Sequence, residues 1–107
     1  MRPLVVMVFL AGCGAVDDTD ARVTAIVATA GDVDAGARVF AARCAPCHGA
    51  AGEGTTAAPA LGARFAARDD AAIARVILTG SGQMPGNPSL SDRDVAAVIA
   101  WGRGALR

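Results

Sequence analysis

The chain of 107 residues has no lysine and no tyrosine, and it contains one histidine, one glutamate, three phenylalanines and one tryptophan. Ten arginines balance ten acidic residues, so the formal net charge is zero. Nucleic-acid binding is not expected, because no basic stripe is available to neutralise phosphates. A structural zinc site needs four Cys or His ligands. The one histidine and three cysteines could supply them only with Cys13, which lies in a very different sequence context.

The run Cys44-Ala45-Pro46-Cys47-His48 carries the strongest chemical signal in the chain. A C-x-x-C-H sequence is the attachment signal of c-type haem. Cys44 and Cys47 can each add to one vinyl group of a single porphyrin. The two thioether bonds then hold His48 where its ring nitrogen can bind the iron. We therefore expect one haem c, covalently bound through both cysteines, with His48 as its proximal ligand.

Two other interpretations of the cysteine pair stay open at this point. A thioredoxin-like dithiol would have the same C-x-x-C spacing, but it belongs beside a strand–helix–strand pattern, and the sequence shows none. The two thiols could also form a disulfide, or have no chemical role at all.

The N-terminus is typical of a targeting segment. Arg2 precedes the apolar run Leu4–Leu10, which is too short to cross a bilayer. The sequence Leu10-Ala11-Gly12-Cys13 resembles the lipobox of bacterial lipoproteins, in which the signal is cut before the cysteine and the thiol is acylated. We expect residues 1–12 to be a lipoprotein-type signal and Cys13 to carry the lipid. A plain secretory signal that happens to contain a cysteine is the alternative.

Residues 13–33 are interpreted as the acylated cysteine and a tether. Asp17, Asp18 and Asp20 favour a solvated stretch, and twenty flexible residues reach roughly 25 Å. The apolar stretch at residues 23–28 is too short to span a membrane. It is expected to pack on the following domain or to form a stray strand.

The remaining residues, 34–107, predict a small all-α domain. Asp34 is expected to cap a first helix that runs through Phe40 into the cysteine motif, and Gly49 and Gly52 to end it. A second amphipathic helix is expected to begin near residues 69–70 and to stop at Gly80.

The last helix has the clearest start in the chain. Ser91 with Asp94 three residues later forms a capping box, and Leu90 can pack on Val95. Its end is expected at Gly102 and Gly104, just after Trp101. No alternating strand pattern of useful length is present.

The second axial ligand of the iron can be sought by elimination. A second histidine ligand is impossible within the chain, and Met1 and Met7 fall in the signal segment, which leaves Met84. Met84 lies at residues 81–86 in a polar loop, where Pro85 and the glycines favour a shaped turn. A lone methionine is often core filler. The polar setting favours a distal ligand here, with packing or an empty distal position as the alternatives.

The region from about Gly31 to Arg107 resembles the small bacterial class I cytochromes c. The resemblance rests on the motif of residues 44–48, the distal Gly82-Gln83-Met84-Pro85 and the closing segment at residues 90–101. It implies three to four helices around one covalent haem.

The resemblance also implies contacts within this chain. Val98 and Trp101 of the last helix are the expected partners of Gly36 and Phe40 in the first. The carbonyl of Pro59 is expected to accept the N–H of His48 and so orient the ligand.

A closed His48/Met84 coordination sphere favours a single-electron carrier over an enzyme, with no small-molecule substrate. The expected partners are redox proteins, such as a membrane oxidoreductase or another cytochrome, which dock transiently. The expected location is periplasm-facing and lipid-anchored, at the outer membrane more than the inner because Gly14 follows Cys13. The alternatives are a haem enzyme or gas-binding protein with an open distal site, and a fixed electron-input subunit of a larger oxidoreductase.

Overall fold

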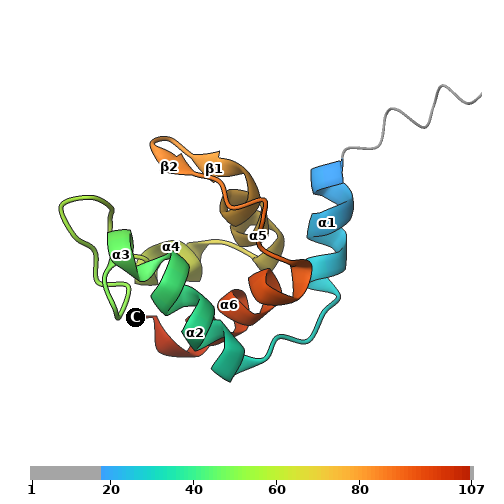
Figure 1. The fold of residues 1–107 in the computed structure, drawn as a ribbon, viewed down its shortest axis with the longest axis horizontal. Coiled ribbons are helices and arrows are strands. Elements are labelled where there is room, and N and C mark those ends of the chain that lie inside the picture. Colours follow the sequence, from blue (N-terminus) through green and yellow to red (C-terminus); the bar gives the residue numbers. More distant parts are fainter. Residues whose placement is uncertain (1–17, 107) are drawn as a thin grey trace, which may run out of the picture.

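The computed structural model describes residues 18–106, which form six helices and one small hairpin (Figure 1). The helices are α1 (Asp18–Val27), α2 (Val33–Arg43), α3 (Ala45–His48), α4 (Gly62–Ala67), α5 (Asp70–Thr79) and α6 (Asp92–Ala105). The antiparallel hairpin joins β1 (Gly80–Ser81) to β2 (Met84–Pro85). The predicted all-α class is confirmed. Helices α1 and α4 are additions that the sequence pattern did not predict.

The crossing of α2 and α6 forms the centre of the fold. Gly36 lies so close to α6 that a β-carbon there would meet the carbonyl of Ala97 and would lie 2.8 Å from Cβ of Trp101. The rings of Phe40 and Trp101 pack with their centroids 4.5 Å apart. The predicted pairing of these helices is therefore present. The partner of Gly36 is Ala97, one residue before the expected Val98, which is itself buried.

The helix starts follow the capping chemistry of the sequence with one correction. Ser91 caps α6, as predicted, by accepting the backbone N–H of Asp94. Helix α5 begins at Asp70, within the predicted start, and its cap is Asp69, which accepts the N–H of Ala72. The cap of α2 is Asp32, whose carboxylate accepts the N–H of Ala35. The prediction of Asp34 as the cap was wrong, because the helix begins one residue before that position.

The last helix runs further than predicted. Gly102 and Gly104 lie inside α6, which ends at Ala105. Tertiary contacts outweigh the low helix propensity of glycine here. A β-carbon on Gly102 would lie 3.0 Å from Cζ of Phe65, so only glycine lets α4 approach. Arg103 reaches over the same ring and donates to the carbonyls of Phe65 and Arg68.

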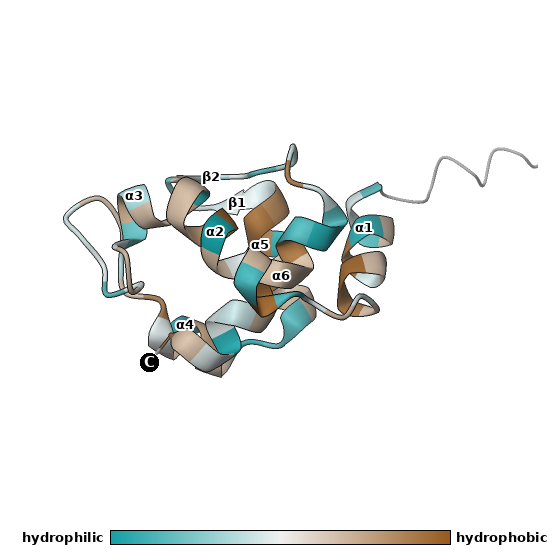
Figure 2. Ribbon diagram, turned by 60° about the horizontal axis from the view of Figure 1, so that its bottom comes forward, coloured by the Kyte–Doolittle hydropathy of each residue, from teal (hydrophilic) through white to brown (hydrophobic). Residues whose placement is uncertain are grey.

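Helix α1 replaces much of the tether expected over residues 13–33. Val23 and Ile26 are buried in the common core with residues of α5 and α6, so the apolar stretch packs on the domain, one of the two expected outcomes. Figure 2 shows apolar residues on the side of α1 that faces the other helices. The predicted signal at residues 1–12 and the lipidated Cys13 lie outside the described residues.

No helix within residues 18–106 combines the length and the apolar character that crossing a bilayer requires.

Candidate haem site

The cysteine motif lies on the short helix α3, which follows α2 almost without a break. The N–H of Cys44 still bonds to the carbonyl of Phe40, and the N–H of His48 bonds back to the carbonyl of Cys44 at 3.0 Å. Both thiols are free, with Cys44 half-buried and Cys47 exposed. The predicted motif thus forms one helical turn, and its two cysteines are not joined by a disulfide in this structure.

The two thiols differ in their surroundings. Burial raises the pKa of the Cys44 thiol, and the nearby Cys47 adds to this, whereas the positive charge of Arg43 opposes it. The neutral thiol is therefore favoured at Cys44. Such a group differs from the activated cysteine of a dithiol oxidoreductase, whose pKa is lowered.

His48 is buried, with 7 % of its surface exposed, and its ring orientation is fixed by the backbone of Pro59. Nδ1 of His48 lies 2.9 Å from the carbonyl oxygen of Pro59. A carbonyl can only accept, so Nδ1 carries the proton and donates it. The lone pair of the neutral ring then lies on Nε2, which is the nitrogen left for a metal.

The loop between α3 and α4 brings Pro59 to His48. The N–H of Gly54 bonds to the carbonyl of His48 at 2.6 Å, and the N–H of Leu61 bonds to the carbonyl of Gly52 at 2.9 Å. Gly54 has φ +94°, and a β-carbon there would lie 2.7 Å from the backbone nitrogen of Ala60. Only glycine combines this conformation with this close approach.

Two side chains add polar contacts to the same loop. The hydroxyl of Thr55 donates to the carbonyl of Cys47 at 2.5 Å, which joins the loop directly to the cysteine motif. The carboxylate of Glu53 accepts the N–H of Ala51 at 2.9 Å. The backbone N–H groups of Glu53 itself and of Ala51 lower the pKa of this carboxyl.

Met84 lies in the hairpin that closes α5. Ser81 pairs with Met84 and Gly80 with Pro85, so Gly82 and Gln83 form the turn. Gly80 ends α5 with φ +87°, and a β-carbon there would lie 2.8 Å from the nitrogen of Gly86. The shaped loop predicted around Met84 is a tight two-stranded turn that returns against the end of α5.

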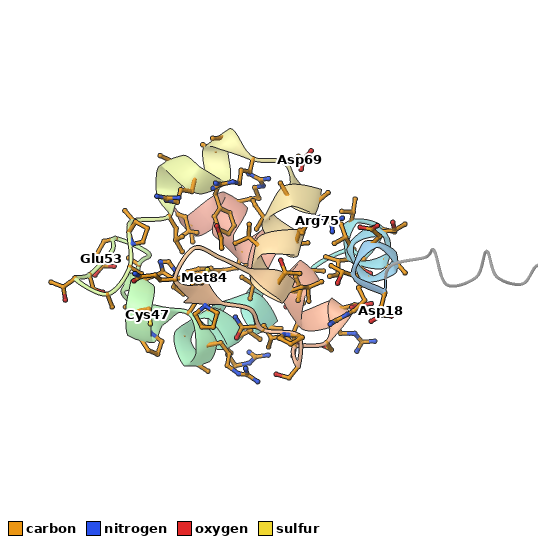
Figure 3. The ribbon with its side chains drawn as sticks, turned by 90° about the horizontal axis from the view of Figure 1, so that it is seen from above. Asp18, Cys47, Glu53, Asp69, Arg75 and Met84 are labelled. Atoms are coloured by element: carbon orange, nitrogen blue, oxygen red, sulfur yellow. The ribbon has the colours of Figure 1, made fainter. Side chains whose placement is uncertain are left out.

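The four candidate ligands come from two distant parts of the sequence, and both parts lie on the side of the molecule away from α1. Figure 3 shows Cys47 and Met84 at the end opposite Asp18, and Figure 1 shows α3 and the hairpin on the side away from α1. An open groove of about 570 Å³ lies beside Pro59, lined also by Ala60, Ala63, Arg64, Ala67 and Arg68. A third arginine, Arg75 of α5, instead pairs with Asp20 of α1 at 2.5 Å.

The donor set fits a covalently attached haem. It comprises two free thiols on one helical turn, an imidazole whose Nδ1 is bonded to a carbonyl so that Nε2 is the nitrogen left for a metal, and a thioether in the hairpin. Within residues 18–106, no three His, Cys, Asp or Glu side chains gather as the ligands of a bare metal ion would.

The comparisons with known proteins address the same residues. Curated proteins and solved structures gave no match. A family model, described as cytochrome c oxidase, cbb3-type, subunit III, matches residues 31–101. This range contains the cysteine motif, Pro59 and Met84, and it covers more than half of the chain. The chain therefore belongs to this family and is a small c-type cytochrome, a domain that serves haem-based electron transfer.

Proposed function

We propose that this chain is a mono-haem, single-electron carrier and that it has no enzymatic activity. Cys44 and Cys47 would hold the haem through thioether bonds, and His48 and Met84 would both bind its iron. The contact of 2.9 Å between His48 Nδ1 and the Pro59 carbonyl carries this proposal. It fixes the tautomer that a proximal histidine ligand needs.

Each residue has a separate task in this proposal. A bound haem c supplies a one-electron Fe(III)/Fe(II) couple. The Pro59 carbonyl keeps the proton on Nδ1 of His48 and makes Nε2 a stronger donor. The hairpin offers the Met84 thioether, a soft neutral ligand that favours the reduced metal and hence a high potential. With both ligand positions filled by the chain, no position is open for a small-molecule substrate.

The proposed setting is a membrane surface that faces the periplasm. The lipobox-like sequence before Cys13 supports an acyl anchor, and Gly14 favours the outer membrane. The proposed partners are redox proteins of a respiratory chain, such as a membrane oxidoreductase or another cytochrome. They would dock transiently through a small interface.

A second role is favoured by one observation, the family description itself. The matched family is named for a subunit of a cytochrome c oxidase. The chain could thus be a fixed electron-input subunit of a larger oxidoreductase, with the same ligands and the same one-electron chemistry.

Optical spectra of the purified holoprotein test the ligand set. We expect the ferric protein to show the weak charge-transfer band of an iron–methionine bond, and Met84→Ala to abolish it. Gln83→Ala is the matched control, because Gln83 is an exposed neighbour in the same turn and should keep the band. A native protein that lacks the band and binds carbon monoxide readily would instead support the gas-binding or enzymatic alternative.

Denaturing mass spectrometry tests the attachment. The native chain should retain the mass of one haem, and the double variant Cys44→Ser/Cys47→Ser should lose it. A native chain that elutes without haem would contradict the proposal.

Membrane fractionation tests the anchor and the partners. Cys13→Ser should release the protein from membranes. Unchanged membrane retention of this variant would contradict the proposed acyl anchor. Co-purification from detergent-solubilised membranes should yield the chain alone if it is a free carrier. A stable complex of fixed composition would favour the subunit role.

A further inference from the structure

Arg22 of α1 contacts the segment that follows Met84 in the chain. We propose that Arg22 is a positioning residue for the Met84 ligand, acting through the backbone of residues 86–91. This inference rests on the proposed function, in which Met84 binds the iron.

The guanidinium of Arg22 makes three hydrogen bonds, all to the chain between the hairpin and the first turn of α6. Its Nη1 donates to the carbonyl of Pro88 at 2.8 Å, and its Nη2 donates to the carbonyl of Leu90 at 2.5 Å. Its Nε donates to Oδ1 of Asp92 at 2.7 Å. The Arg22 side chain is 20 % exposed, and its bonds to Leu90 and Asp92 are partly buried, whereas the bond to Pro88 is exposed.

The same segment is also held by α5. The N–H of Asn87 bonds to the carbonyl of Ile77 at 2.7 Å. A β-carbon on Gly86 would lie 2.7 Å from the carbonyl carbon of Thr79, so the backbone at Gly86 also packs tightly on the end of α5. The segment after Met84 is thus held first by α5, at residues 86–87, and then by Arg22, at Pro88 and Leu90. Only three residues separate Met84 from Pro88.

A thioether ligand needs such support. A thioether is neutral, so no charge attraction strengthens its bond to a metal. The strength of the bond therefore depends on how well the loop pre-organises the ligand. The guanidinium suits this task because its planar fork can donate to several acceptors at fixed angles, which an ammonium group cannot do. Helix α1 lies before the matched residues 31–101. Arg22 therefore lies outside the matched range, whereas its three hydrogen-bond acceptors lie inside it.

Imidazole competition on the ferric holoprotein tests the proposal, because imidazole binds the iron only where Met84 has left it. For Arg22→Ala we expect imidazole to bind about tenfold more tightly. The variant loses two or three hydrogen bonds to a charged donor, so Met84 should leave the iron more readily. Arg22→Lys should recover part of the difference. The matched control is Arg75→Ala, which removes another ion pair of α1, with Asp20, and leaves the three hydrogen bonds of Arg22 in place. Its imidazole affinity should be unchanged.

Hydrogen exchange of the same proteins supplies a second readout. The amides of Asn87 and Leu90 should exchange about tenfold faster in Arg22→Ala than in the native protein, while amides in α2 should not change. If Arg22→Ala does not fold, Asp92→Asn removes the charge of one partner and should move both readouts in the same direction by a smaller factor.

The outcomes separate the two proposals. A native protein with no iron–methionine band would overturn the proposed ligand set and, with it, the role of Arg22. A native protein with the band, but with the same imidazole affinity in Arg22→Ala and Arg75→Ala, would overturn the role of Arg22 alone. This includes an equal rise in imidazole affinity in both variants, which would assign the effect to α1 as a whole.

Discussion

The carbonyl oxygen of Pro59 lies 2.9 Å from Nδ1 of His48, although the two residues are eleven positions apart and belong to a loop and a helix. Gly54 makes this contact possible, because its positive φ lets the loop fold back and its missing β-carbon leaves room for residues 59–60. The orientation of His48 therefore depends on Gly54, a residue whose role is only to shape the backbone of the loop.

Gly54→Ala should weaken this contact. A β-carbon at φ +94° and 2.7 Å from the nitrogen of Ala60 should destabilise the fold by about 3 kcal/mol. The Fe(III)/Fe(II) potential should rise, because a less well oriented His48 donates less to the oxidised iron. Thermal unfolding and a redox titration measure the two effects. Pro59→Ala is the control: it keeps the carbonyl, so we expect a cost of about 0.5 kcal/mol and little change in potential.

Two glycines of α6 should respond in opposite directions to alanine. A β-carbon on Gly104 would have no neighbouring atom within 4 Å, so Gly104→Ala should stabilise the protein by about 0.5–1 kcal/mol. Gly102→Ala should destabilise it by about 1–3 kcal/mol, because the new methyl group meets the ring of Phe65. Denaturant unfolding of the holoprotein measures both. A Gly104→Ala variant that gains no stability would mean that α6 ends before Gly104 in solution.

The N-cap of α2 can be identified by substitution. Asp32→Ala should cost about 1 kcal/mol, because the N–H of Ala35 loses its acceptor. Asp34→Ala should cost less, about 0.3 kcal/mol, since Asp34 lies in the first turn and contributes only a favourable charge. Thermal unfolding of the two variants decides, and a larger loss in Asp34→Ala would contradict the assigned cap.

Electron exchange at the haem end should be nearly independent of salt. Residues 44–63 and 79–91 hold all the candidate ligands, and apart from His48 their only ionisable side chains are the two thiols and Glu53. Arg64 and Arg68 line the groove beside Pro59 and add two positive charges to this end. Self-exchange between the oxidised and reduced proteins should change less than about twofold when the salt concentration rises from about 0.01 to 0.1 M, although the Debye length falls from about 30 to 10 Å. Stopped-flow or NMR measurements of the exchange rate test this. A tenfold change would indicate that charges elsewhere on the surface steer the encounter.

Much of the fold was predictable because the signals were local. The caps of α5 and α6 depend on Asp69 and Ser91, which bond to N–H groups three residues away. The cysteine motif is equally local, since its five consecutive residues alone identify it. The contact of Pro59 with His48 followed from the family resemblance, and no rule of spacing would have found it.

The parts that the sequence did not reveal depend on tertiary packing. Helix α1 was interpreted as a tether because its acidic residues favoured a solvated stretch. Val23 and Ile26 nevertheless have helical spacing, and both are buried. The end of α6 was placed too early because the two glycines were judged by propensity, without the ring of Phe65. Arg22 carried no motif at all, and its three acceptors lie 66 to 70 positions away.

The packing of α1 changes how far the redox centre can travel. With a lipid on Cys13, as proposed, only residues 14–17 separate the anchor from the first residue of α1. Five extended residue steps span about 17 Å at most, and Asp18 lies at the end of the molecule opposite Cys47 and Met84 (Figure 3). This short linker would keep the candidate haem end pointing away from the bilayer, at a nearly constant height above it. A partner would have to present its own redox group at that height.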